Sequence, residues 1–148
     1  MADEKSNDPL AIALFSELVA TEQLAKMRLK RALPKGMELS HFSVLNHFAR
    51  LGGEKTPAQL ARIFNVTKGA MTNTLTKLET AGYVHIRPDW NDARRKFVSI
   101  SPAGKSARDR AVEATASVFD DVLKKVGPDR VRDALPILRE LRLALNPD

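Results

Sequence analysis

Hydrophobic positions recur with the period of an α-helix along most of the chain. The pattern predicts a long helix over residues 10–32, a second over residues 41–51 that Ser40 caps, and a short third helix that Thr56 caps and that ends near residue 64. A fourth helix is predicted from Thr67, as its cap, to about residue 81. In the first helix Leu14, Phe15, Leu18 and Val19 cluster on one side, and in the second Phe42, Leu45, Phe48 and Ala49 form the apolar stripe.

After Gly82 the spacing of apolar residues changes to alternation. Residues 83–87 and 96–100 therefore predict two strands, joined by a loop of several residues with turn-forming composition at 88–92. Ser101 followed by Pro102 predicts the start of a long helix over residues 102–126. A last helix ends near residue 145 and is expected to bend at Pro136. Residues 1–9 are expected to be disordered.

Composition and charge narrow the function classes. The chain has 148 residues, which suits one domain, and a formal net charge of +6, which favours an anionic partner such as nucleic acid or a membrane surface. No cysteine is present, and the three histidines are scattered, so thiol chemistry and a zinc site are not expected. No apolar run reaches the roughly 20 residues of a membrane helix, and the acidic, polar N-terminal segment does not resemble a secretory signal.

The fourth predicted helix has two distinct faces. Met71, Leu75 and Leu78 share one side and can anchor the helix to a core. The opposite side is small, polar and almost free of acid, with Lys68 in the first turn and Lys77 at the margin; it comprises Gly69, Thr72, Asn73, Thr76 and Thr80. Such a face suits the major groove of DNA. The alternative is an ordinary solvated face, although threonine, which also occurs at position 74, is a poor helix former there.

The predicted hairpin is the second basic feature. It carries four basic residues, Arg87, Arg94, Arg95 and Lys96, against Asp89 and Asp92. Arginines at a hairpin tip can enter the minor groove, and Asp92 can hold Arg94 or brace the loop. The alternative is a charged hairpin that is merely solvated. Two short helices followed directly by a hairpin describe a winged helix-turn-helix, so the fold class is mainly α with a small β-hairpin.

Three segments resemble the MarR family of bacterial transcription regulators: residues 39–45 (LSHFSVL), 56–62 (TPAQLAR) and 92–104 (DARRKFVSISPAG). The resemblance implies a homodimer and a single domain over residues 10–148. Within it, the winged helix-turn-helix would span about residues 38–102, and the dimerisation helices about 10–33 and 103–146. The apolar last helix agrees with burial in a dimer, although packing within one chain would also cover it.

The resemblance also implies the DNA-binding residues. In the recognition helix these are Lys68, Gly69, Thr72, Asn73, Thr76 and Lys77. In the wing they are Arg87, Asp92, Arg94 and Arg95, and Thr56 and Gln59 are added as phosphate contacts.

Members of the MarR family often release DNA when a small aromatic or phenolic acid binds between the dimer platform and the winged helix. Here His41 is the candidate polar group for such an acid, and the alternative is that it is a solvated first-turn residue. No cofactor or metal is expected.

The expected function is therefore a cytoplasmic, sequence-specific and ligand-responsive repressor that binds a pseudo-palindromic operator in double-stranded DNA as a homodimer. An enzyme is not expected, because no nucleophile set, metal-ligand spacing or phosphate loop occurs. Two alternatives remain: an architectural DNA-binding protein without sequence preference, and a protein-interaction module on the same fold. The operator, the target genes, the source organism, the effector and the choice between repression and activation do not follow from the sequence.

Overall fold

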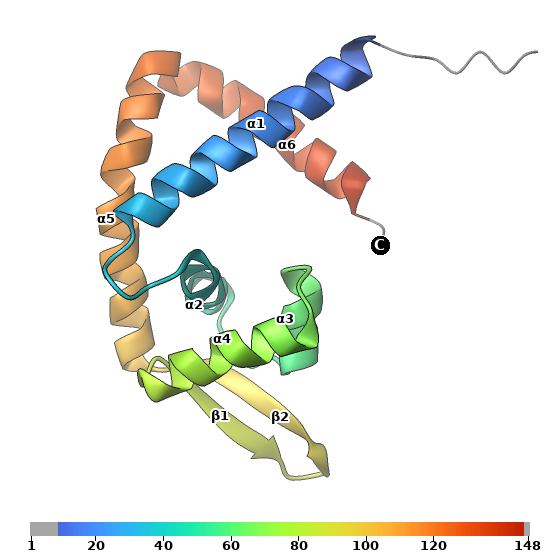
Figure 1. The fold of residues 1–148 in the computed structure, drawn as a ribbon, viewed down its shortest axis with the longest axis vertical. Helices are drawn as coiled ribbons and strands as arrows, with labels where there is room; N and C mark the ends of the chain where they lie inside the picture. Colours follow the sequence, from blue (N-terminus) through green and yellow to red (C-terminus); the bar gives the residue numbers. More distant parts are fainter. Residues whose placement is uncertain (1–8, 147–148) are drawn as a thin grey trace, which may run out of the picture.

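The computed structural model describes residues 9–146, so the disorder predicted for residues 1–9 lies, apart from Pro9, outside the described residues. The helices are α1 (Pro9–Ala32), α2 (Leu39–Leu51), α3 (Pro57–Ile63), α4 (Lys68–Thr80), α5 (Pro102–Val126) and α6 (Pro128–Leu145), and the strands are β1 (Val84–Asp89) and β2 (Asp92–Ile100). Figure 1 shows the winged part at one end and α1 and α6 at the other, with α5 running between them. The mainly helical fold with a small hairpin is confirmed.

One small core holds the winged part together. It collects apolar side chains from α2, α3, α4, both strands and the first half of α5. Phe48 and Leu45 of α2 and Leu60 of α3 lie at its centre and are almost fully buried. Burial of such side chains contributes about 1.5–3 kcal/mol each, so this cluster fixes α4 and the hairpin relative to each other.

The start of α2 differs from the prediction. The N-cap is Glu38 and not Ser40, and His41 occupies the third helical position, where its Nδ1 accepts a hydrogen bond from the Glu38 backbone N–H at 3.1 Å. The helix therefore begins at Leu39 and not at His41. Its buried apolar face also differs, because Val44 is buried while Phe42 and Ala49 are only half-buried.

The wing is tighter than predicted. The strands pair antiparallel from Val84 with Ile100 to Asp89 with Asp92, so the loop shrinks to a two-residue turn, Trp90 and Asn91. The register shifts between Pro88 and Asp89, and residues 93–95 bulge out of the ladder. Lys55 adds an isolated antiparallel bridge to Val98, which ties the segment before α3 to the wing.

The junction between the wing and α5 is closely packed. Ser101 caps α5 as predicted, accepting from the Gly104 N–H at 3.0 Å and donating to the Gly82 carbonyl at 2.6 Å. A Cβ on Gly104 would collide with the backbone carbonyl of Tyr83. Only glycine fits this position, because the helix starts directly against the chain that leads into β1.

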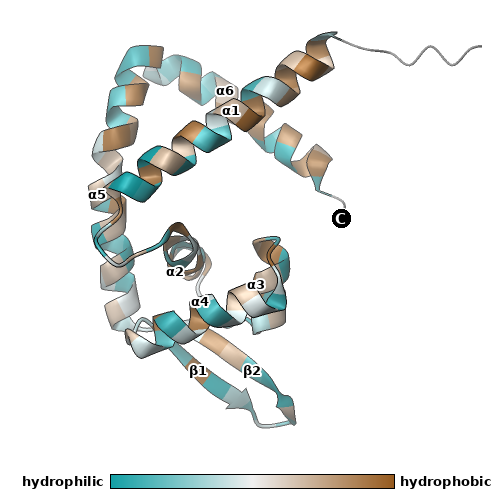
Figure 2. Ribbon diagram, in the orientation of Figure 1, coloured by the Kyte–Doolittle hydropathy of each residue, from teal (hydrophilic) through white to brown (hydrophobic). Residues whose placement is uncertain are grey.

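The outer helices expose apolar side chains. No described residue of α1 or α6 is buried, although Phe15 and Leu138 are large and apolar. Figure 2 shows hydrophobic residues distributed along both helices. Each of these helices packs against α5. The second half of α5 exposes Phe119 as well.

Candidate nucleic-acid interface

The helix-turn-helix is formed by α3 and α4. Thr56 begins α3 with a complete capping box: its hydroxyl accepts from the Gln59 N–H at 3.2 Å, and the Gln59 Oε1 accepts from the Thr56 N–H at 2.9 Å. The two helices are joined through Asn65, which adopts a positive φ of 51°, a conformation that asparagine tolerates better than most residues. Thr67 then caps α4 by accepting from the Ala70 N–H. These local features match the sequence-based expectations.

The face of α4 that points away from the core is polar and exposed. Met71, Leu75 and Leu78 are buried as predicted. Thr74 is buried too. The sequence analysis grouped it with the threonines of the polar face, and the structure separates it from them. The Thr76 hydroxyl donates to the Thr72 carbonyl at 2.9 Å, so it presents its methyl group and an acceptor oxygen outward. Both groups can contact base edges in a major groove.

Two open clefts lie between α4 and the wing. The first, of about 270 Å³, brings together Thr56, Lys68, Thr72, Arg94, Arg95 and Lys96. The second, of about 410 Å³, adds Thr76, Glu79, Arg87 and Pro88. The clefts share Thr72 and Lys96, so they form one basic groove along α4. We call this surface the α4–wing groove.

Several predicted residues lie outside the α4–wing groove or are engaged in other contacts. Gln59, Gly69 and Asn73 are exposed on α3 and α4 beside it. Lys77 lies on another side of α4, where its Nζ is 3.8 Å from Glu38 Oε1 and where it lines a different cavity. Thr56 borders the groove but is buried, and its hydroxyl oxygen is engaged in the capping box. The structure therefore brings only part of the predicted set together.

Arg87 makes an ion pair that the sequence did not indicate. Its Nε donates to Glu54 Oε1 at 2.8 Å, and a terminal nitrogen donates to Glu54 Oε2 at 2.7 Å. The guanidinium also lies over the Phe97 ring, 4.7 Å from its centroid. Hydrogen bonds from Arg87 lower the pKa of Glu54, so the carboxylate stays ionised at neutral pH. Arg87 thereby connects the wing to the segment before α3.

Asp92 braces the wing as the sequence analysis suggested. Its Oδ1 accepts from the Arg94 backbone N–H at 3.0 Å and from Arg94 Nε at 3.2 Å. These hydrogen bonds, the backbone one foremost, lower the pKa of Asp92. The Arg94 side chain nevertheless remains 91% exposed, so its charge faces solvent.

Sequence reasoning missed three residues of this region. Lys96 was recognised as basic but not assigned to the site, and Glu54 and Glu79 were not considered. The strand alternation was a usable signal for Lys96. Glu54 is 33 positions from Arg87, and nothing local in the sequence indicates their contact.

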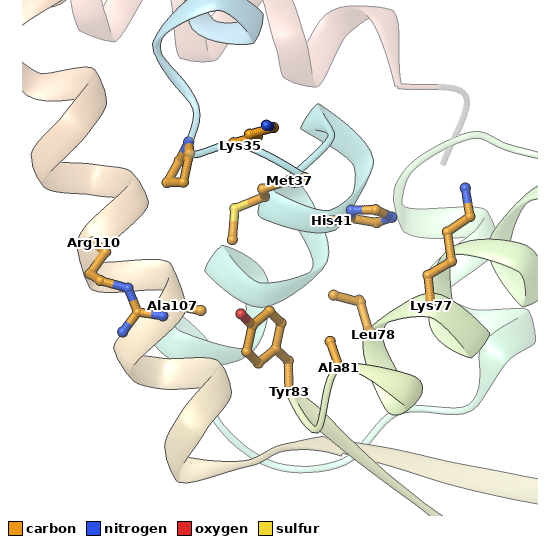
Figure 3. Close-up of a pocket in the computed structure, with 11 residues that line it drawn as sticks. Lys35, Met37, His41, Lys77, Leu78, Ala81, Tyr83, Ala107 and Arg110 are labelled. Carbon is orange, nitrogen blue, oxygen red and sulfur yellow. The ribbon is translucent and has the colours of Figure 1, made fainter.

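A separate cavity, of about 340 Å³, lies between α2, α4 and α5, on the side of α4 away from the groove (Figure 3). We call it the α2–α5 cavity. Its lining combines the apolar Met37, Leu78, Tyr83 and Ala107 with the cationic Lys35, Lys77 and Arg110. His41 also lines it and is buried, so it is not the solvated first-turn residue considered as an alternative. His41 is also not the single polar group there, because three basic side chains share the lining.

The protonation state of His41 follows from its surroundings. Burial lowers its pKa, and this effect exceeds the opposing influence of Glu38, so the ring is neutral at pH 7. Nδ1 accepts from Glu38, and the proton is therefore on Nε2. Among the described residues Nε2 has no hydrogen-bond partner.

Within residues 9–146, no group of His, Cys, Asp and Glu side chains could hold a metal ion. In the same described range, none of the helices combines the length and the hydropathy needed to cross a bilayer. The capped helix pair, the tight wing and the basic groove between them define a winged helix-turn-helix protein.

Comparison with known proteins relates part of this chain to one family. A model of the MarR family matches residues 35–95. An uncharacterized HTH-type transcriptional regulator from Bacillus cereus is 35% identical over 74 residues, which are 47% of this chain and 48% of the relative. The match therefore spans about half the length of that relative.

Two solved structures share the fold over most of the chain. A mutant of Escherichia coli MarR complexed with operator DNA has a TM-score of 0.74 at 23% identity and covers 88% of this chain and 94% of that one. Bordetella bronchiseptica BpsR, whose DNA binding is regulated by 6-hydroxynicotinic acid, has a TM-score of 0.76 at 14% identity and covers 88% and 98%. The Bacillus cereus relative is named as a transcriptional regulator, and both solved structures concern DNA binding. The chain therefore matches the MarR family over residues 35–95 and shares the fold of MarR-type regulators over most of its length.

Proposed function

We propose that this protein is a transcription regulator that binds specific sequences in double-stranded DNA as a homodimer. The α4–wing groove carries the proposal, because it combines basic side chains with exposed threonines on one helix face. Lys68, Arg94, Arg95 and Lys96 can neutralise phosphates, while Thr72, Asn73 and Thr76 can reach base edges. Bound operator DNA in the E. coli relative supports the same use of the fold.

A homodimer is supported by the apolar surface of the outer helices. Phe15 is 68% exposed on α1, and Ile137 and Leu138 are 59% and 47% exposed on α6. Such side chains on three long helices form more apolar surface than the small core can cover. In a symmetric pair these helices pack against their copies, and two α4 helices then read half-sites about 34–36 Å apart.

A small-molecule effector is supported by the α2–α5 cavity, the 340 Å³ cavity that His41 lines. Its cationic rim, neutral His41 and apolar floor suit an anion with an apolar body, such as an aromatic or phenolic acid. The regulation of BpsR by 6-hydroxynicotinic acid supports this class of ligand. Binding would stabilise one orientation of the winged helices and so change the half-site spacing. Repression is the proposed outcome, and the cytoplasm is the proposed location, because bacterial and archaeal chromosomes lie there.

The decisive experiment is selection of bound sequences from a random DNA pool. The expected result is one pseudo-palindrome, with binding that weakens steeply as salt rises. A Thr72→Ala/Thr76→Ala variant should select a relaxed sequence, because a true base contact is worth about 1–3 kcal/mol. Uniform enrichment without a palindrome would instead favour the architectural protein. Absence of salt-dependent binding would favour the protein-interaction module.

The effector is tested separately by thermal unfolding with 6-hydroxynicotinate and 4-hydroxyphenylacetate. A ligand that binds only the folded state raises the midpoint in proportion to RT ln(1 + [L]/Kd). An Arg110→Ala variant should reduce that increase, whereas Lys124→Ala, a charge loss at the far end of α5, should not. Equal shifts in both variants would exclude this cavity as the binding site.

A further inference from the structure

The turn at the tip of the wing presents an unusual side chain. Trp90 is 83% exposed, more than any other large hydrophobic residue among those the structure describes. It occupies the two-residue turn between Asp89 and Asp92. Asp89 Oδ1 accepts from the Asn91 N–H at 2.9 Å, and Asp92 accepts from the Arg94 N–H, so side chains hold both ends of the turn. The indole is thus displayed on a braced support.

The surroundings of Trp90 indicate what covers it. The other strongly exposed apolar residues, such as Phe15 and Leu145, lie mostly on the outer helices, at the opposite end of the molecule (Figures 1 and 2). β2 begins with Asp92 and Ala93, and the three residues after them are basic and exposed: Arg94, Arg95 and Lys96. An apolar protein partner would have to desolvate these charges, whereas DNA would pair with them. DNA is therefore the occupant that fits both features.

The chemistry of the indole then selects a groove and a base pair. With α4 in the major groove, the wing beside it extends toward the neighbouring minor groove, which is about 6 Å wide and admits a planar ring edge-on. The indole Nε1–H is a donor only. In the minor groove an A·T pair displays only acceptors, whereas G·C adds the N2 amino donor of guanine. The ring is therefore complementary to A·T and opposed by G·C.

We propose that Trp90 enters the minor groove beside each half-site and makes the protein prefer A·T pairs there. This inference rests on the proposed DNA-binding function. Trp90 would determine specificity in a different way from Arg94. The charge of Arg94 favours a narrow, electronegative groove but does not distinguish whether a guanine amino group is present.

The test uses the selected operator duplex with the pairs flanking each half-site changed to A·T, G·C or inosine·C. Inosine lacks the N2 amino group, so inosine·C keeps the major-groove pattern of G·C but not its minor-groove donor. The protein should bind the A·T and inosine·C duplexes about fivefold or more tightly than G·C, the lower end of what one disfavoured pair costs. Trp90→Phe, which keeps a ring but lacks the N–H, should lose this preference. Trp90→Ala should lose affinity as well.

Controls separate this inference from the proposed function. Arg94→Ala should weaken binding to all three duplexes and should leave the difference between inosine·C and G·C in place. Trp90 is the only tryptophan in the chain, so its emission should shift when duplex DNA saturates the protein. Two outcomes would overturn the inference: Trp90 emission that DNA leaves unchanged, or a Trp90→Phe variant that keeps the preference for A·T and inosine·C. If Arg94→Ala still weakened DNA binding in that case, the proposed DNA-binding function would stand. If Arg94→Ala and Thr76→Ala had no effect either, the proposed function itself would fail.

Discussion

Replacing Arg94 by alanine should weaken DNA binding in a salt-dependent way. Arg94 lines the α4–wing groove with a side chain that is 91% exposed, and its exposed ion pair with Asp92 is weak, so the guanidinium is available to phosphate. Each phosphate contact adds about 0.9 to the slope of log K against log salt. A dimer presents Arg94 twice, so the slope should fall by about 1.8. Between about 50 and 200 mM salt, the ratio of wild-type to variant affinity should then change by about tenfold.

The assay is a set of anisotropy titrations of a labelled operator duplex at several salt concentrations. Lys77→Ala is the matched control, because it removes the same charge from the same region but from the side of α4 that faces Glu38. Its slope should equal that of the wild type. The control also tests the sequence-based assignment of Lys77 to the DNA surface: a lowered slope would support that assignment, and an unchanged slope would agree with the position of Lys77 beside Glu38. An unchanged slope for Arg94→Ala, or an equal decrease in both variants, would refute the reasoning.

Three further predictions concern assembly, packing and pH. Leu138→Glu should convert dimers to monomers, because it places a charge in the apolar surface of α6. Leu51→Glu, on a more exposed residue of α2, should leave the dimer intact. Light scattering measures the masses, and a dimer of both variants would contradict the interface. Gly104→Ala should lower the free energy of unfolding by about 1–3 kcal/mol, because the new Cβ would collide with the Tyr83 carbonyl. Gly69→Ala should raise the free energy of unfolding by up to about 1 kcal/mol, because a Cβ there has no atom within 4 Å and alanine favours the helix. Urea denaturation measures both changes. Burial lowers the pKa of His41 below its ordinary value of 6.5, so as the pH falls the unfolded chain binds the proton before the folded chain does. The contribution of His41 to the free energy of unfolding is therefore full above pH 6.5 and should be lost as the pH falls below it, and His41→Gln should make this decline shallower. Identical pH profiles of the wild type and the variant would show that His41 does not contribute.

The local signals in the sequence predicted most of the secondary structure. Thr56, Thr67 and Ser101 cap the helices expected of them, because side-chain oxygens satisfy the first free N–H groups over a span of three residues. The apolar core positions of α4, which are Met71, Leu75 and Leu78, follow from helical periodicity, whereas the burial of Thr74 does not. The error at α2 has the same local origin: His41 supplies the ring nitrogen that completes a capping box, and this role for histidine was not considered.

The DNA surface was harder to predict because it depends on contacts between distant segments. Arg87 was assigned to DNA from the resemblance to the MarR family, but Glu54, which comes from the segment before α3, accepts two hydrogen bonds from it. Lys77 has the right sign and lies on the right helix, yet a rotation of about 140° around the α4 axis separates it from Thr72 and places it beside Glu38. The wing turn was predicted too long because Pro88 was treated as a breaker, although proline is accepted at an irregular edge position.

The acidic residues around the groove bear on the choice between a specific regulator and an architectural protein. Glu54 withdraws Arg87 from phosphate, Asp92 offsets part of the charge of Arg94, and Glu79 lines the groove beside Thr76. A protein that binds any sequence gains its affinity from phosphates, so carboxylates at the contact surface would weaken it without benefit. A protein that reads bases tolerates them, because a reduced phosphate attraction lowers binding to all competing sites and leaves discrimination to the base edges. The carboxylates therefore favour the sequence-specific regulator, with Thr72, Asn73 and Thr76 as the discriminating side chains.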